Sequence, residues 1–156
     1  MPNWCEGCLK VRGTFANLKD FVKYGMEAVG AYGSVKSHPL IEETADLFYM
    51  DGSNTLFYLE NTRRHFVEPD CIEFYTKGTG DEPIVILLPL KAAWGIDAYD
   101  LQKLCQKYHV DMKIQGFECG MQFSQLIEII DGKIVEDKKI KYDDWYWDCP
   151  CPDTGG

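Results

Sequence analysis

The sequence has no long apolar segment. Its longest run of apolar residues extends from Ile84 to Leu90, whereas a membrane-spanning helix needs about 20 such residues. The first residues, Met1–Glu6, contain no basic segment followed by an apolar one, so they do not resemble a secretory signal peptide. We therefore expect a soluble, cytoplasmic protein.

Basic residues are scarce as well. The 156 residues include 16 lysines and arginines but 25 aspartates and glutamates, which gives a formal net charge of −9 at pH 7. Non-specific binding to nucleic acid and docking on anionic membranes both require clustered basic side chains. The charge therefore disfavours both kinds of target, and it favours a basic protein as partner.

The sequence also lacks the motifs of established catalytic sites. The three histidines, His38, His65 and His109, do not have the spacing of a metalloprotease helix. The glycine-containing segment 77–81 lacks the pattern of a phosphate-binding loop. A cysteine–histidine pair that meets only after folding remains an alternative. Because no residue is singled out for such a role, we expect a protein without enzymatic activity.

Apolar residues are abundant, at 46%, and the length corresponds to one domain of about 100–200 residues. Residues 8–12 alternate apolar and basic side chains, which predicts a strand. Asn17 is the expected N-cap of a helix whose apolar face extends to Val29. Gly30 and Gly33 are expected to end this helix.

The last third of the sequence predicts a central strand over 84–90, buried on both faces. It also predicts a helix that begins at an Asp97 cap. Three antiparallel strands should follow, with Asp131-Gly132 as the hairpin turn between the last two.

The middle region, residues 31–82, is predicted to be a β-rich insertion, in which 47–50 and 56–59 form a hairpin and 71–75 another strand. The complete pattern predicts an α+β fold: two helices on one face of a mainly antiparallel sheet, in a ferredoxin-like split βαβ arrangement.

Two blocks of sequence resemble a known family. The start, Met1–Cys5, followed by Leu9–Gly13 and an amphipathic helix, is similar to the YubB-type ferredoxin-like family of plasmid, phage and other mobile-element proteins. The segment from Ala93-Trp94 through a helix to Phe117–Phe123 resembles that family's Trp, helix and E-x-G-x-x-F block. The two blocks cover about half of the chain. The sequence departs from the family at Cys8, where a polar residue is usual, and at Gly95, where proline is common.

The resemblance implies a ferredoxin-like fold and the cytoplasm of a bacterial host, but no activity. We expect the motif residues to be packing residues; they are Asn3, Trp4, Trp94, Gly120 and Phe123.

The seven cysteines include two close pairs. Four thiolates from Cys5, Cys8, Cys149 and Cys151 would complete a tetrahedral zinc site, provided that the chain turns at Glu6-Gly7. The alternatives are that Cys5 is a buried apolar residue and that the other three are incidental thiols. A small structural zinc module is thus the second hypothesis for the function.

The tail, residues 143–156, suggests a binding surface. It alternates acids with large aromatic side chains, and tryptophan and tyrosine are enriched at interface hot spots. We predict that it contacts a basic partner, together with acids from the base-free stretch 41–60. An aromatic side chain that closes the core is the alternative. The predicted contact residues are Asp143, Asp144, Trp145, Tyr146, Trp147, Asp148, Glu42, Glu43 and Asp46.

These observations favour a non-enzymatic, acidic binding protein of a phage or mobile element. Its predicted partner is a host nucleic-acid enzyme, such as a CRISPR effector or a restriction complex, whose basic channel it would occupy and inhibit. The strands lack the basic and aromatic run of an RNA-binding sheet, which disfavours direct nucleic-acid binding.

Overall fold

The computed structural model describes residues 2–29 and 39–156. The strands are β1 (Trp4–Gly13), β2 (Met26–Val29), β3 (Ile41–Glu43), β4 (Leu47–Asp51), β5 (Leu56–Leu59), β6 (His65–Val67), β7 (Cys71–Tyr75), β8 (Ile84–Ala93), β9 (Asp111–Glu118), β10 (Phe123–Ile130) and β11 (Lys133–Lys141). The helices are α1 (Phe15–Tyr24), α2 (Ala98–Tyr108) and the single turn α3 (Trp145–Asp148).

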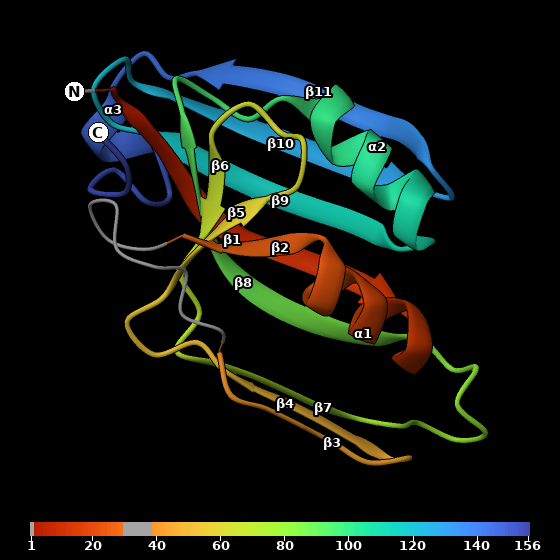
Figure 1. The fold of residues 1–156 in the computed structure, drawn as a ribbon. Coiled ribbons are helices and arrows are strands. Elements are labelled where there is room, and N and C mark those ends of the chain that lie inside the picture. The colour runs from red at the N-terminus through yellow and green to blue at the C-terminus, as the bar shows by residue number, and fades with distance from the viewer. Residues whose placement is uncertain (1, 30–38) are drawn as a thin grey trace.

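Eight strands form one antiparallel sheet in the order β11-β10-β9-β1-β8-β6-β5-β2, and β3, β4 and β7 form a second, smaller sheet. Helices α1 and α2 contact each other and cover one face of the large sheet (Figure 1). The protein is therefore α+β with a mostly antiparallel sheet, as predicted. The sheet is larger than expected because β6, β5 and β2 extend it beyond β8.

Helix α1 ends earlier than its apolar pattern predicts. It ends at Tyr24 with Gly25 as its C-cap; the Gly25 N–H donates to the Phe21 carbonyl at 2.8 Å, and the site has no room for a Cβ. Met26–Val29 then continue as β2, which pairs with β5. The predicted end, at Gly30 and Gly33, lies outside the described residues. The apolar pattern predicted too long a helix, because its last two residues, Met26 and Val29, belong to the half-buried strand β2.

Both long helices begin at a side-chain cap. Asp97 caps α2 as predicted, since its carboxylate accepts hydrogen bonds from the backbone N–H groups of Tyr99 and Asp100. At α1 the cap is Thr14 rather than Asn17. The Thr14 hydroxyl accepts a hydrogen bond from the Asn17 N–H at 3.3 Å, so the predicted cap residue lies inside the first turn.

The hairpin predicted between 47–50 and 56–59 does not form. β4 pairs with β3 and β7 in the small sheet, whereas β5 pairs with β2 and β6 in the large one. The chain crosses between the sheets at Gly52, whose N–H donates to the Asp70 carbonyl at 2.9 Å. The Pro69 backbone leaves no room there for a side chain. The insertion therefore contains two segments, β4–β5 and β6–β7, that run together from one sheet to the other.

Strand β8 lies between β1 and β6, so its predicted central position is confirmed. Only one of its faces is buried, however. Ile86, Leu88 and Leu90 point into the core, whereas Val85 and Leu87 are 51% and 61% exposed. The prediction of burial on both faces was wrong because α1 and α2 cover the same side of the sheet.

The structure of the last third of the chain agrees best with the prediction from sequence. Asp131 and Gly132 form a two-residue turn with φ of 51° and 69° between β10 and β11. Helix α2 buries its apolar stripe against the sheet, and the buried residues are Ala98, Leu101, Leu104, Cys105 and Tyr108.

The neighbouring leucines of β8 give the first prediction. Leu88→Ala should lower the free energy of unfolding by about 3 kcal/mol, because it leaves a cavity in the core. Leu87→Ala should change it by less than about 0.5 kcal/mol. Denaturant unfolding of the two variants measures the difference, and equal losses would contradict the one-sided burial of β8.

Candidate functional site

The four cysteines proposed for zinc do not come together. β1 is continuous from Trp4 to Gly13, with no turn at Glu6-Gly7, so Cys5 and Cys8 point to opposite faces of the sheet. Cys5 is fully buried, and burial, reinforced by the charge of Glu118, raises the pKa of its thiol to about 12. Such a protonated thiol is a poor metal ligand.

The other pair is separated as well. Cys149 is buried against Phe117 and Trp145, whereas Cys151 is exposed. Across residues 2–29 and 39–156, no three His, Cys, Asp or Glu side chains are grouped so that they could hold a metal ion. The predicted zinc site is therefore not assembled, because strand alternation and a separate apolar cluster divide its ligands.

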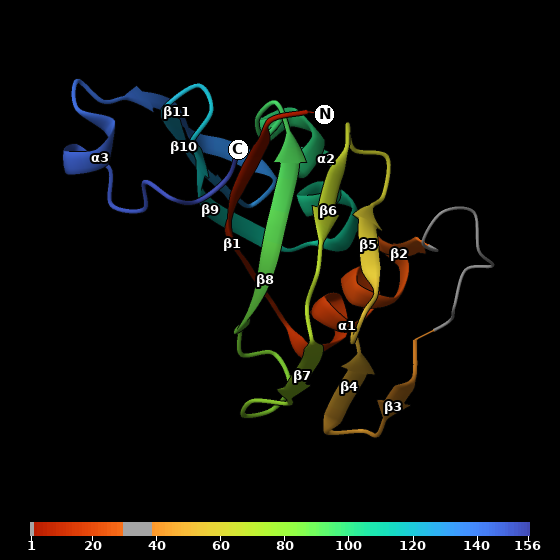
Figure 2. The ribbon, with the colours of Figure 1, turned by 90° about the vertical axis from the view of Figure 1, so that its left-hand side faces the viewer.

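The tail folds onto the helix-free face of the large sheet, at the end of β9 and β10 (Figure 2). Trp145 is its anchor, at 2% exposure, and packs with Phe117 and Tyr142. The indole N–H of Trp145 donates to the Pro152 carbonyl at 2.8 Å. The Tyr142 hydroxyl is 2.9 Å from the Ser124 hydroxyl. One aromatic side chain thus closes a small second core.

The far end of the tail is also fixed. The Gly156 N–H donates to the Trp4 carbonyl at 2.9 Å, and the Trp4 N–H donates back at 3.3 Å. Gly155 adopts φ +80° and has the backbones of Trp4 and Phe117 so close that no side chain fits. Residues 145–154 are consequently a loop attached to the sheet at both ends.

The remaining predicted contact residues of the tail are on the surface. Trp147 is 86% exposed and Tyr146 is 67% exposed. Asp143, Asp144 and Asp148 are exposed around them. Asp144 also caps α3, because its carboxylate accepts a hydrogen bond from the Trp147 N–H. The loop therefore presents two aromatic rings among carboxylates.

The acids of the stretch 41–60 lie elsewhere. Glu42, Glu43 and Asp46 are exposed on and beside the small sheet, at the opposite end of the molecule from α3 (Figures 1 and 2). Glu43 also forms an ion pair with Lys23 at 3.3 Å. The expectation that these acids share a face with the tail was wrong, because the insertion folds as a separate sheet.

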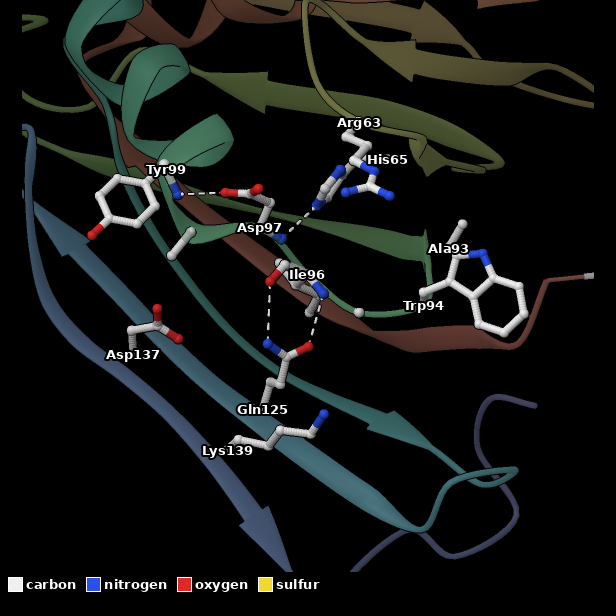
Figure 3. Close-up of a pocket in the computed structure, with 12 residues that line it drawn as sticks. Arg63, His65, Ala93, Trp94, Ile96, Asp97, Tyr99, Gln125, Asp137 and Lys139 are labelled. Atoms are coloured by element: carbon white, nitrogen blue, oxygen red, sulfur yellow. Dashed lines mark hydrogen bonds between the residues drawn. The ribbon is translucent and has the colours of Figure 1, made fainter.

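A cavity of about 330 Å³, which the sequence did not indicate, lies between the β8–α2 turn and strands β10 and β11 (Figure 3). Gln125 fixes its floor: the side-chain oxygen accepts from the Ile96 N–H at 2.8 Å, and the side-chain amide donates to the Ile96 carbonyl at 3.1 Å. The Asp97 N–H donates to His65 Nε2 at 3.0 Å. The turn is thereby held from two sides.

The turn itself has an unusual backbone. Trp94 adopts φ +66° and Gly95 φ +136°, although a bulky residue rarely enters the left-handed region. The Trp94 N–H donates to the Asn3 carbonyl at 2.8 Å, yet the Trp94 side chain is 59% exposed. Strain of this kind persists where the surrounding structure over-determines it, which is common at functional sites. The sequence identified Trp94 only as a residue of the family resemblance, and it did not indicate this backbone conformation.

Two other residues of the resemblance, Gly120 and Phe123, are packing residues, as expected. Phe123 is buried. Gly120 has no room for a Cβ, because the side chains of Asn3 and Glu118 crowd it. The fully buried Glu118 carboxylate accepts hydrogen bonds from the N–H groups of Gly120 and Met121, at 2.8 and 2.6 Å. Trp94 is the exception, because it lines a cavity and is largely exposed.

No protein family, curated protein or solved structure matches the chain. Of the helices that the structure describes, none is both long and apolar enough to cross a membrane.

Trp145 and Trp147 form a matched pair for testing the tail. Trp145→Ala should lower the free energy of unfolding by about 3 kcal/mol, because it empties the small core. Trp147→Ala should change it by less than about 0.5 kcal/mol. Thermal unfolding together with limited proteolysis of the tail distinguishes the two. A proteolysis rate that Trp145→Ala leaves unchanged would contradict the anchoring role.

His65 supplies a prediction for pH. It is fully buried, with no hydrogen-bond partner at Nδ1 among the described residues. Burial lowers its pKa from the ordinary 6.5, against the opposing charges of Asp100 and Asp97 and the nearby Arg63 backbone. The unfolded chain therefore binds the proton first, so stability is complete above pH 6.5 and decreases as the pH falls below it.

His65→Gln should remove this part of the pH dependence, while His109→Asn, at an exposed helix end, should retain it. Urea unfolding of each variant between pH 5 and about pH 8 measures the slope. A slope that is the same in the wild type and in His65→Gln would show that His65 does not carry it.

Proposed function

We propose that this protein is a non-enzymatic binding protein that docks on a basic partner through its tail. The observation that carries the proposal is the exposure of Trp147 and Tyr146, at 86% and 67%, on a loop attached at both ends. Large exposed aromatic side chains cost solvation energy in a free protein, and they contribute most of the affinity in many interfaces.

Rigidity strengthens this argument. A flexible peptide loses conformational entropy when it binds, whereas a loop that already has its bound shape does not. The Trp145 core and the Gly155–Gly156 attachment hold the backbone on either side of Trp147. Each tryptophan or tyrosine side chain has only two rotatable bonds, so little further ordering is required.

Charge indicates what kind of partner fits. Residues 143–156 contain acids and no lysine or arginine, and the whole chain has a net charge of −9. Such a surface attracts a basic protein over long range and repels nucleic acid. Nucleic-acid enzymes hold DNA or RNA in positively charged channels, and an acidic protein that inserts an aromatic anchor would compete for such a channel.

The resemblance to YubB-type proteins supports the setting of this proposal. The order β9-β1-β8, with α1 and α2 on one face, agrees with a ferredoxin-like split βαβ core. We assign the chain on this basis to a phage or another mobile element, acting in the bacterial cytoplasm. The partner class is then a host-defence enzyme, such as a CRISPR effector or a restriction complex, which the protein inhibits.

The test compares two variants that each lose three carboxylates. Asp143→Asn, Asp144→Asn and Asp148→Asn together remove three of the four carboxylates of the tail but keep its caps. Glu42→Gln, Glu43→Gln and Asp46→Asn together neutralise the far end. Inhibition of purified basic nucleases should weaken strongly with salt and with the tail variant, and only slightly with the far-end variant.

Trp147→Ala should weaken inhibition by about 2 kcal/mol, roughly thirtyfold, as for a central hot-spot residue. Inhibition constants in nuclease assays give this value. Nucleases that remain fully active at saturating protein, or equal effects of the tail and far-end variants, would contradict the proposal.

A further inference from the structure

The cavity beside the β8–α2 turn is separate from the tail and plays no part in the proposed docking. Its volume of about 330 Å³ is at the lower end of the range for small-molecule sites, about 300–1,000 Å³. Two hydrogen bonds between Gln125 and the Ile96 backbone, and one from the Asp97 N–H to His65, fix its floor without a ligand. It is therefore a pre-formed site of a size suited to a small molecule.

Two aromatic side chains stand at opposite ends of the cavity in Figure 3. Trp94 is 59% exposed and Tyr99 is 68% exposed, although both line the cavity. Trp94, whose φ is +66°, has its ring at the rim of the cavity and not in the core. Ring faces of this kind, with their negative electrostatic potential, pack well against polarised C–H groups.

The charges of the cavity are balanced. Arg63 and Lys139 supply donors, whereas Asp97 and Asp137 supply acceptors. Across the described part of the chain, none of these four side chains takes part in an ion pair. One oxygen of Asp97 caps α2, and the other accepts no hydrogen bond from a described residue. The Lys139 ammonium lies over the Phe123 ring, 3.6 Å from its centroid, but pairs with no carboxylate of a described residue. Groups of both signs thus face a ligand.

This balance decides the ligand class. A phosphate ester needs a net positive site, and a bare ammonium group needs a net negative one. Hydroxyl groups each donate and accept one or more hydrogen bonds, so they match a site with both kinds of group. A sugar ring combines such hydroxyls with an apolar C–H face that fits an exposed indole or phenol. We propose that this cavity binds a neutral saccharide.

The experiment follows the Trp94 indole N–H and the Gln125 side-chain amide in ¹⁵N–¹H spectra. The probes are glucose, galactose, maltose and lactose, with glucose 6-phosphate, glucosamine and adenosine as matched charged and aromatic compounds. At least one neutral sugar should shift both signals in a saturable way and should bind more tightly than its charged analogue. A disaccharide preferred over its monosaccharide indicates a glycan as the natural source.

Two variants connect the shifts to the cavity. Trp94→Ala and Asp137→Asn should each weaken binding at least about tenfold, and the exposed position of Asp137 on β11 makes the second variant neutral for folding. Trp147→Ala, in the tail, should leave the affinity unchanged.

A panel in which no neutral sugar shifts these signals would overturn the proposal, as would tighter binding of the phosphate, the amine or adenosine. Each of these results leaves the tail experiment unaffected, so the two proposals fail independently.

Discussion

The backbone hydrogen bonds of Asn3 and Trp4 join the start of β1 and the residue before it to two distant segments. The Asn3 carbonyl accepts from Trp94 in the β8–α2 turn, and Trp4 pairs with Gly156 at the end of the tail. The Asn3 side chain also lies against Gly120 in the β9–β10 turn. Because β1 lies in the middle of the large sheet, these contacts attach both the tail and the β8–α2 turn to one end of a central strand.

This arrangement explains why the two sites have different characters. The tail is attached at both ends but lies outside the main core, so its aromatic rings and carboxylates point into solvent. The β8–α2 turn is fixed from beneath by Gln125 and from the side by His65. The cavity beside it is open to solvent and is lined by charges of both signs. A protein partner suits the first surface, and a small neutral molecule suits the second.

The sequence predicted those parts of the fold that depend on local pattern. The Asp97 cap, the stripe of α2 and the Asp131-Gly132 turn each follow from a few neighbouring residues. The errors arose where distant contacts decide the structure. Helix α1 ends at its C-cap Gly25, and the next residues form β2 because they pair with β5. The expected hairpin does not form because β4 pairs with β7 in the small sheet and β5 pairs with β6 in the large one.

The candidate sites divide in the same way. The aromatic and acidic composition of the tail was visible in the sequence. Which tryptophan is buried was not visible, because Trp145 packs against Phe117 and Tyr142, which lie outside the tail. The cavity was not predictable, since its residues come from four separate segments of the sequence. The zinc hypothesis did not survive because an uninterrupted β1 turns Cys5 and Cys8 to opposite faces.

The central claim is that the tail is a rigid platform for Trp147, and ¹⁵N relaxation tests it most directly. Backbone order parameters across residues 145–154 should be near about 0.85, like those of the sheet. The same residues in Trp145→Ala should fall well below the wild-type values. Order parameters below about 0.6 in the wild-type tail would contradict the claim, because a flexible segment does not present a pre-formed surface.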